Sequence, residues 1–241
     1  MVRPTLFEIL KIRFKAFLYG DKNGVSVNHL EKTTNGIFFR LEDLIQAEKE
    51  LPNQMLNYLS ESKKLFKKTI AIQQQITNTR WNAEQNLISL LYSLICIRKP
   101  SLIIETGVAN GISTNAIMSA LERSKGSGAL HSFDVLLETS KAYKGNGNWH
   151  FHLLNAGRAH TELKNEVGGL GKPDVWLHDS NHGYRWQKFE YLLAMKFLKK
   201  GGILISDDID ASPAWAELAG SLFRKSYIVF DNRKLIGIAF K

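Results

Sequence analysis

The chain has 241 residues, of which 44% are hydrophobic and 23% are charged, and its formal net charge is +9 at pH 7. This composition excludes a disordered chain and predicts a folded protein with one sizeable core. The basic excess suits nucleic acid, anionic lipid surfaces or acidic small molecules, and does not choose among them. The single cysteine, Cys96, lies in an apolar run, which excludes a disulfide framework and a thiolate metal site.

The first twenty residues lack the features of a secretory signal, because charges interrupt every apolar stretch. No segment approaches the roughly 18 apolar residues in a row that a membrane span needs. A cytoplasmic protein without a transmembrane segment is therefore expected. Apolar residues at helical spacing, mixed with lysine and arginine, predict a basic amphipathic helix over residues 4–19. Packing of this helix on its own domain or on a second subunit is favoured over contact with a membrane surface.

The next segment contains a loop, a short apolar stretch and a charged helical region. Residues 20–36 have the composition of a loop, and residues 36–39 form either a strand or a buried turn. From residue 41 to residue 76 the pattern is helical and rich in lysine. We predict that residues 1–80 form a helical N-terminal extension that serves as a lid or as an oligomer contact. A homo-oligomer is expected, because helical appendages commonly serve association.

A different pattern begins after Arg80. A helix is expected over residues 81–98, and apolar strands then alternate with amphipathic helices, which indicates βαβ units. The expected strands are residues 101–106, 129–135, 150–154, 174–179, 202–208, 226–230 and 235–240. Because only DNRK separates the last two, the final strand must run antiparallel to its neighbour. Residues 81–241 therefore predict a three-layer αβα sandwich on a mostly parallel, seven-stranded sheet with an antiparallel last strand.

A glycine-bearing turn joins the first expected strand of this domain to the next helix. Gly107 and Gly111 suit such a turn, since a ligand that presses on the backbone leaves no room for a Cβ. The amides at the start of the following helix suit a carboxylate. The spacing of the two glycines does not match a G-x-G-x-x-G dinucleotide site.

The run ETGVANGIST, residues 105–114, resembles the first motif of class I S-adenosylmethionine-dependent methyltransferases. It is most similar to the metal-dependent small-molecule O-methyltransferases, of the catechol type and of the type that methylates macrolide sugars. The resemblance implies S-adenosylmethionine as the cofactor, with Glu105 near its amino group. The residues expected to surround its methionine moiety are Gly107, Ala109, Gly111 and Ser113. Ala109 stands where the family often has a glycine.

Asp134 closes the expected strand 129–135, at the distance from the glycine turn that suits a second βα step. An acidic side chain there can accept hydrogen bonds from both ribose hydroxyls, which predicts a cofactor contact. The following run, residues 150–163, resembles the adenine-side strand and loop of the family. Asn155 or Gly157 is assigned to the cofactor there.

Three aspartates follow two strands that this topology makes neighbours. Asp179 ends one of these strands, and Asp207 with Asp208 ends the other. Carboxylates that converge without nearby bases repel one another unless a cation neutralises them, and hard divalent ions prefer oxygen ligands. The resemblance implies the same, with Mg²⁺ held by these three residues and Asp179 also near the cofactor. In the alternative, Asp207 and Asp208 cap the helix expected near Ser212, and Asp207 binds neighbouring loop amides without a metal.

His182 lies three residues after Asp179, where relatives with a D-x-x-H spacing keep a general base. An imidazole with an ordinary pKa near ~6.5 can take a hydroxyl proton around neutral pH, so His182 is the candidate catalytic residue. In the alternative it braces the cofactor or caps the helix that begins at Gly183. His178 points to the opposite face of its strand from Asp179 and is interpreted as structural.

These observations predict a metal-assisted O-methyltransferase acting on a hydroxylated small molecule such as a sugar, a polyketide or a phenol. A nucleic-acid methyltransferase ranks below it, because the chain lacks both an N/D-P-P-Y/F/W block and a Pro-Cys nucleophile. The third hypothesis is a nonenzymatic cofactor-binding scaffold whose basic N-terminal region recruits a partner. The intact acids at 179, 207 and 208 count against it.

Overall fold

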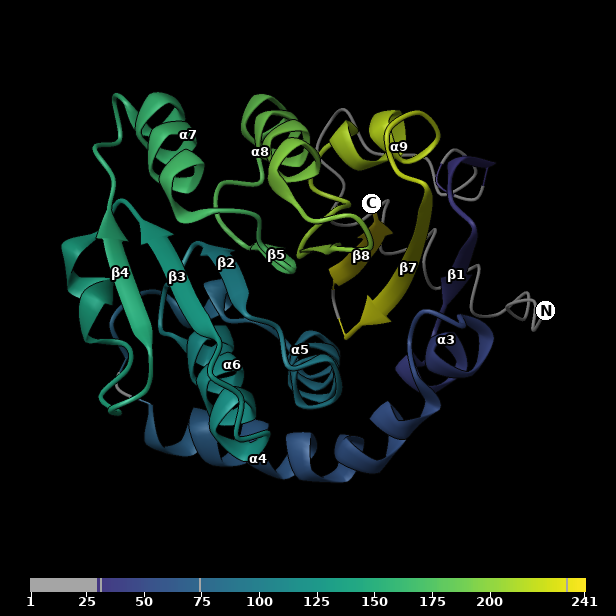
Figure 1. Cartoon of the computed structure of the whole chain (residues 1–241), viewed down its shortest axis with the longest axis horizontal. Helices are drawn as coiled ribbons and strands as arrows, with labels where there is room; N and C mark the ends of the chain where they lie inside the picture. The colour runs from purple at the N-terminus through teal and green to yellow at the C-terminus, as the bar shows by residue number, and fades with distance from the viewer. Residues whose placement is uncertain (1–29, 31, 74, 233) are drawn as a thin grey trace.

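The computed structural model describes residue 30 and residues 32–73, 75–232 and 234–241. The basic helix expected over residues 4–19 lies outside this part of the chain. One mixed sheet of eight strands crosses the described residues, and helices pack on both of its faces (Figure 1). This arrangement confirms the predicted αβα fold class.

The sheet has the strand order β1-β7-β8-β6-β5-β2-β3-β4. In chain order the strands are β1 (Gly36–Phe38), β2 (Leu102–Thr106), β3 (Ala129–Asp134), β4 (Trp149–Leu153), β5 (Val175–His178), β6 (Ile203–Ser206), β7 (Lys225–Asp231) and β8 (Lys234–Phe240). Every neighbouring pair is parallel except β6 with β8 and β7 with β8. The antiparallel last strand predicted from the short DNRK link is therefore confirmed.

The sheet has one strand more than the seven expected, because β1 pairs in parallel with β7. Asn35 fixes this pairing from both directions. Its backbone N–H donates to the carbonyl of Ser226 at 2.7 Å, and its side-chain oxygen accepts from the N–H of Ser226 at 2.8 Å. The apolar stretch that the sequence left open between a strand and a buried turn is a strand. The proposed division at residue 80 and the role of the N-terminal segment stay predictions.

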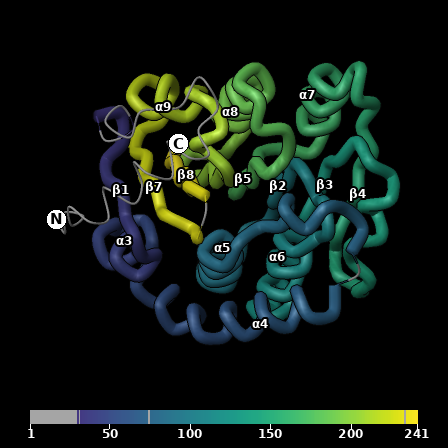
Figure 2. Tube along the Cα trace, turned by 180° about the vertical axis from the view of Figure 1, so that it is seen from behind, coloured from purple at the N-terminus to yellow at the C-terminus, as the bar shows by residue number. Residues whose placement is uncertain are grey.

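Two layers of helices cover the sheet. One layer consists of α3 (Leu41–Ala47), α4 (Leu59–Ile72), α5 (Gln85–Arg98) and α6 (Ile112–Arg123), and the other of α7 (Ala159–Leu170), α8 (Tyr184–Phe197) and α9 (Ala214–Ala219). Short 3-10 turns lie at η1 (Asn53–Tyr58), η2 (Thr79–Trp81) and η3 (Leu137–Lys141). The view from behind shows α4 running along the outside of α5 and α6 (Figure 2).

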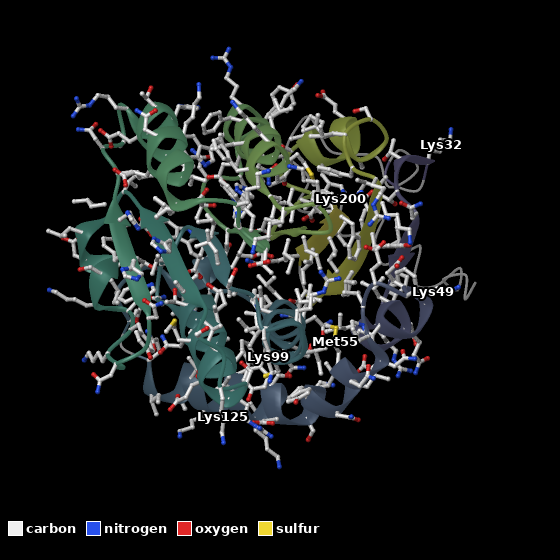
Figure 3. All side chains as sticks on the ribbon, viewed as in Figure 1. Lys32, Lys49, Met55, Lys99, Lys125 and Lys200 are labelled. Carbon is white, nitrogen blue, oxygen red and sulfur yellow. The ribbon has the colours of Figure 1, made fainter. Side chains whose placement is uncertain are left out.

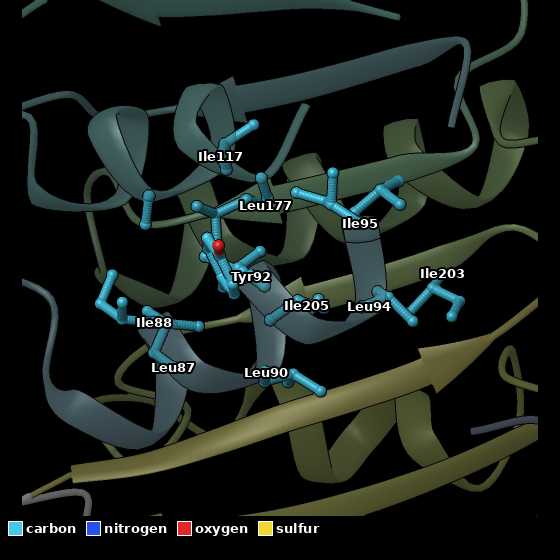
Figure 4. Packing of buried hydrophobic residues seen from close by; sticks show 14 of the residues in the cluster. Leu87, Ile88, Leu90, Tyr92, Leu94, Ile95, Ile117, Leu177, Ile203 and Ile205 are labelled. Carbon is cyan, nitrogen blue, oxygen red and sulfur yellow. The ribbon is translucent and has the colours of Figure 1, made fainter. Parts of the chain in front are cut away.

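Helix α5 is the centre of one hydrophobic core, and all its residues from Leu87 to Cys96 are buried (Figure 4). A helix that is buried around its whole circumference needs cover on every side, which here comes from the sheet, α6 and α4. Asp231 caps its start, since its carboxylate accepts from the N–H groups of Asn86 and Leu87, both at 2.8 Å. Within the described residues, no helix has the length and apolar character to cross a membrane.

Candidate active site

A cavity of about 620 Å³ opens beyond the carboxyl ends of the central parallel strands. Its wall includes residues that directly follow β2, β3, β5 and β6, as expected for an open sheet of this kind. The volume is in the range of small-molecule and cofactor sites. The wall residues from strand ends and their loops include Thr106, Gly107, Ala109, Phe133, Asp134, Asp179, His182 and Asp208.

The glycine turn after β2 is shaped by the backbone of the neighbouring strand. Gly107 has φ +83°, and a Cβ added there would lie 2.0 Å from the carbonyl oxygen of Asp179. At Gly111, φ is +73° and an added Cβ would lie 2.5 Å from the Cβ of Ala142. Glycine is therefore required by close packing of backbone and of Ala142, rather than by a ligand alone. Gly107 and Ala109 line the cavity, whereas Gly111 is not part of its wall.

Ala109 adopts a left-handed conformation with φ +47°. This region costs an L-residue roughly 1–2 kcal/mol, which explains why relatives often place glycine here. Backbone strain of this kind persists where the surrounding structure holds it, and often lies in binding sites. Ala109 therefore takes a left-handed backbone conformation of the kind that glycine adopts easily.

Glu105 is wholly buried beneath the turn and does not line the cavity. Its Oε2 accepts hydrogen bonds from the hydroxyls of Thr114 at 2.7 Å and Ser132 at 2.6 Å. Burial raises its pKa to about 7, against the lowering effect of hydroxyl donors that include Ser113. The carboxylate therefore joins β2 to α6 and β3. The prediction that Glu105 lies near the cofactor's amino group stays untested, and its visible contacts are structural.

Asp134 lies at the tip of β3 and lines the cavity, as the sequence predicted. Its carboxylate accepts from the backbone N–H of Val108 at 2.8 Å and of Leu136 at 3.0 Å, with a longer contact of 3.4 Å from Ala109. These bonds tie the glycine turn to the β3 loop. The side chain is therefore held at the cavity wall in a fixed orientation.

The region assigned to adenine is apolar. Leu154, Ala156, Ala159 and Leu163 line the cavity there. Asn155 is exposed and is not part of the wall; its Oδ1 accepts from the N–H of Gly157 at 3.0 Å, and its own N–H donates to Glu162 at 2.7 Å. Asn155 and Gly157 shape the loop, and a cofactor contact from either stays a prediction.

Residues 75–82 lie at one side of the cavity, where Thr77, Arg80 and Trp81 form part of the wall. The buried side chain of Asn110 holds this segment. Its Oδ1 accepts from the N–H groups of Ile76 and Thr77, both at 2.7 Å, and its amide donates to Asn82 at 2.7 Å. Asn110 was not identified from the sequence, because an asparagine between two glycines of a turn is expected to face solvent.

The three aspartates converge as predicted, but they do not lack a nearby base. Asp179 and Asp208 line the cavity, while Asp207 is wholly buried. The Nζ of Lys234, at the start of β8, pairs with Asp207 and lies 3.2 Å from the Oδ2 of Asp208. The expectation that only an external cation neutralises these acids is therefore wrong. A lysine in a short turn between strands gives no sign in the sequence that it will be buried.

The electrostatics of the cluster follow from burial and mutual proximity. Burial, then the neighbouring Asp208, raises the pKa of Asp207 to about 6. Burial and Asp207 raise the pKa of Asp179 well above its ordinary value. The pKa of Lys234 is raised as well, because attraction to the three aspartates outweighs the opposing effect of burial.

His182 lines the cavity between two of these acids. Its Nδ1 lies 3.6 Å from the Oδ2 of Asp208, and its Nε2 lies 3.8 Å from the Oδ1 of Asp179. Burial and the neighbouring His178 lower the pKa of His182 to about 4. The imidazole is therefore neutral near pH 7 and keeps a lone pair that can accept a proton.

The alternative capping roles are not observed. Helix α9 begins after Pro213 without a side-chain cap, and Ser212 supplies the nearest hydroxyl contact, 3.3 Å from the N–H of Ala214. Helix α8 also begins without a side-chain cap. Neither the aspartate pair nor His182 is occupied in capping a helix.

His178 is wholly buried and does not line the cavity, which agrees with its structural interpretation. It pairs with Glu190 of α8, whose carboxylate also accepts from Thr106 at 2.6 Å and Ser180 at 2.9 Å. Glu190 reaches the cavity wall and was missed by the sequence analysis. A glutamate on an amphipathic helix is expected in solvent, so only the fold reveals this position.

We predict that Gly107→Ala lowers the free energy of unfolding by about 3 kcal/mol or more, because the added methyl group meets the carbonyl oxygen of Asp179. Urea denaturation measures the change. Gly169→Ala is the matched control, since nothing lies within 4 Å of its added Cβ and it stands in α7. The control should gain up to about 1 kcal/mol. Equal stability of Gly107→Ala and the wild type would contradict the packing argument.

A second prediction concerns pH. With the pKa of Glu105 raised to about 7, the folded chain holds a proton between about pH 4.5 and 7 that the unfolded chain has released. This carboxyl group therefore makes stability fall as pH rises through that range. Glu105→Gln removes this titrating group. The free energy of unfolding of the variant, measured relative to that of the wild type, should therefore rise by roughly 1–3 kcal/mol between about pH 4.5 and pH 7. Denaturation at both ends of the range tests this, and a constant difference would refute it.

Comparison with known proteins agrees with this geometry. Residues 104–209 match the family model of a methyltransferase domain. No curated protein matches the chain in sequence. Among solved structures, the chain is similar to an O-methyltransferase from Bacillus cereus in complex with SAH, at 12% identity and a TM-score of 0.50 over 85% of this chain and 98% of that chain.

Two further structures show the same fold. An SAH-bound methyltransferase from Podospora anserina has 11% identity and a TM-score of 0.50, over 100% of this chain and 99% of that chain. A Klebsiella pneumoniae protein described as an O-methyltransferase has 13% identity and a TM-score of 0.52, over 82% of this chain and 94% of that chain. At these identities the likeness shows the fold alone, and that fold is the αβα fold of these methyltransferases. Residues 104–209, less than half of the chain, are similar in sequence to a methyltransferase domain.

Proposed function

We propose that this protein transfers the methyl group of S-adenosylmethionine to a hydroxyl group of a small molecule. The observation that carries the proposal is that one cavity joins Asp134, at the tip of β3, to Asp179 and His182, beyond the tip of β5. Strand β2 lies between these two strands, so the glycine turn is at the centre of the cavity wall. The arrangement offers a ribose acceptor on one side and a proton acceptor on the other.

The residues present fit the cofactor. Asp134 is held by backbone amides at the position expected for the ribose, and the wall next to it is apolar, as an adenine ring requires. Gly107 and Ala109 expose backbone to the cavity between them. When bound, S-adenosylmethionine supplies an electrophilic methyl group. The chain has to bind it, exclude water and present an acceptor oxygen to it.

His182 is the residue that takes the acceptor's proton in this proposal. Its Nε2 has no hydrogen-bond partner among the described residues, and its ring is neutral near pH 7. The lowered pKa makes it a weak base, so it removes a proton only as the oxygen begins to bond and becomes acidic. Positioning of the two reactants supplies the larger part of the acceleration.

A small acceptor is favoured over nucleic acid by the composition of the cavity wall. The cavity wall itself carries Trp81, Val135, Leu136 and Trp186 beside its few polar groups, as in small-molecule sites.

The acid cluster does not fit the divalent metal that the sequence implied. In the described part of the chain, no group of three or more His, Cys, Asp or Glu residues is arranged to hold a metal ion. Lys234 already contacts Asp207 and Asp208, which were to be two of the three ligands. The proposed reaction therefore contains no metal step. A cytoplasmic location and a homo-oligomer stay predictions.

Calorimetry with S-adenosylmethionine tests the proposed cofactor site. We expect Asp134→Ala to weaken binding by about tenfold or more, the value of a lost charge-assisted hydrogen bond. Glu138→Ala, an exposed acid in the next turn, is the control and should bind as the wild type does. Wild-type protein that binds no S-adenosylmethionine would refute the proposed function, and unaltered affinity of Asp134→Ala would remove the ribose assignment.

Turnover tests the role of His182. Release of SAH is measured with a panel of phenols, sugars and polyketides as acceptors. We expect His182→Ala to keep its cofactor affinity and to lose about 10²-fold or more in turnover, the usual contribution of a general base. His150→Ala, an exposed histidine of β4, should leave turnover unchanged. Full turnover of His182→Ala would make His182 a structural residue.

A further inference from the structure

Lys234 is a buried lysine among acids, unlike the exposed lysines labelled in Figure 3. Only 4% of its surface is exposed, and Asp207 beside it is wholly buried. Burial of an ammonium group is costly unless an opposite charge compensates it. The buried ammonium group of Lys234 is therefore compensated by the aspartates, and the buried carboxylates are compensated by Lys234.

The ammonium group of Lys234 contacts the carboxylates of two aspartates. The Nζ of Lys234 pairs with the Oδ2 of Asp207 and lies 3.2 Å from the Oδ2 of Asp208. The other oxygen of Asp207, Oδ1, is buried and has no hydrogen-bond partner within the described chain. Among the described residues the cluster is therefore incompletely satisfied, and Lys234 is a cation in direct contact with it.

The backbone fixes this contact. Strand β8 is antiparallel to β6, so it begins beside the end of β6, where the acid pair follows. The N–H of Ile209 donates to the carbonyl of Leu235 at 3.1 Å, and the N–H of Leu235 donates to Asp210 at 3.2 Å. These bonds fasten the acid-bearing loop to the first residues of β8. Lys234 consequently has little freedom to withdraw and admit another ion.

Asp208 itself is held in a left-handed conformation, with φ +46°. Aspartate tolerates this region better than most residues, but it still carries strain that the surroundings must hold. Its carboxylate contacts Lys234 and also lies 3.6 Å from the Nδ1 of His182. Asp208 is thus the connection between the buried ammonium group and the proposed proton acceptor.

We propose that the ammonium group of Lys234 permanently holds the cation position of this acid cluster, so that the enzyme binds no divalent metal there. This inference rests on the methyl-transfer function proposed above. A metal ion bound to the same oxygens at about 2.1 Å would lie within roughly 5 Å of the ammonium nitrogen, where two cations repel each other strongly. Lys234 is a positioning residue, because it acts on the reaction through Asp208 and His182.

Binding of Mn²⁺, followed by the electron paramagnetic resonance of the free ion, tests this without any measurement of activity. The wild type should show no site that depends on the acid cluster. Lys234→Met removes the ammonium group and should bind Mn²⁺ at least about tenfold more tightly, because three carboxylates then lack a counter-charge. Adding Asp208→Asn to that variant should remove the gained site, and Lys234→Arg, which keeps the charge, should resemble the wild type.

Lys225→Met is the matched control. Lys225 lies on β7 and pairs with Glu48 and Glu50 away from the cavity, so its loss should create no such site. Removing one partner of a buried ion pair can unfold a protein, whereas removing both is often tolerated. If Lys234→Met does not fold, Asp207→Asn/Lys234→Met carries the comparison with Asp179 and Asp208 as the remaining carboxylates, and its Mn²⁺ binding should still be tighter than that of the wild type, by a smaller factor.

Two results would overturn the proposal. One is Mn²⁺ binding by the wild type that Asp208→Asn abolishes. The other is a folded lysine-free variant that binds Mn²⁺ no more tightly than the wild type does. Calorimetry with S-adenosylmethionine in the presence of EDTA reports separately on the cofactor site. Absence of S-adenosylmethionine binding in that measurement would refute the methyl-transfer function. The Mn²⁺ titrations test only the role of Lys234.

Discussion

The close approach of two backbones, at Gly107 and Asp179, is the constraint on which the site depends. A Cβ at Gly107 would lie 2.0 Å from the carbonyl oxygen of Asp179, and the N–H of Asp179 donates to the carbonyl of Thr106 at 2.9 Å. The turn after β2 and the turn after β5 are therefore in contact. Asp134 fastens the same glycine turn to β3 from the other side. The side of the cavity at Asp134 and the side at Asp179 are consequently joined through one glycine turn.

The sequence predicted the features that depend on local pattern. Runs of apolar residues identified β2 to β8, the DNRK link required an antiparallel last strand, and Asp134 and Asp179 were placed at strand tips that do line the cavity. Each of these follows from a short stretch of chain together with the rule that parallel strands end at one edge.

What the sequence could not predict depends on contacts between distant segments. Asn110 binds residues more than thirty positions earlier, and Lys234 contacts an acid 27 positions away. A polar residue of this kind resembles an ordinary surface residue until the fold surrounds it. The eighth strand was left open between a strand and a buried turn for the same reason, because three residues of β1 become a strand only through β7. Local pattern specifies the elements, and the packing between them specifies which polar groups are buried.

Topology explains why the chain supplies a cation at this edge. In a sheet of parallel strands, the carboxyl ends and the acids that follow them gather on one side, while the first residue of each strand lies on the other. Strand β8 is inserted antiparallel between β6 and β7, so its first residue, Lys234, lies on the side of the acids. A lysine that begins a parallel strand would be a full strand length away from Asp207. The antiparallel strand that completes the sheet therefore also provides a position for a fixed counter-charge, and a lysine there competes directly with a metal ion.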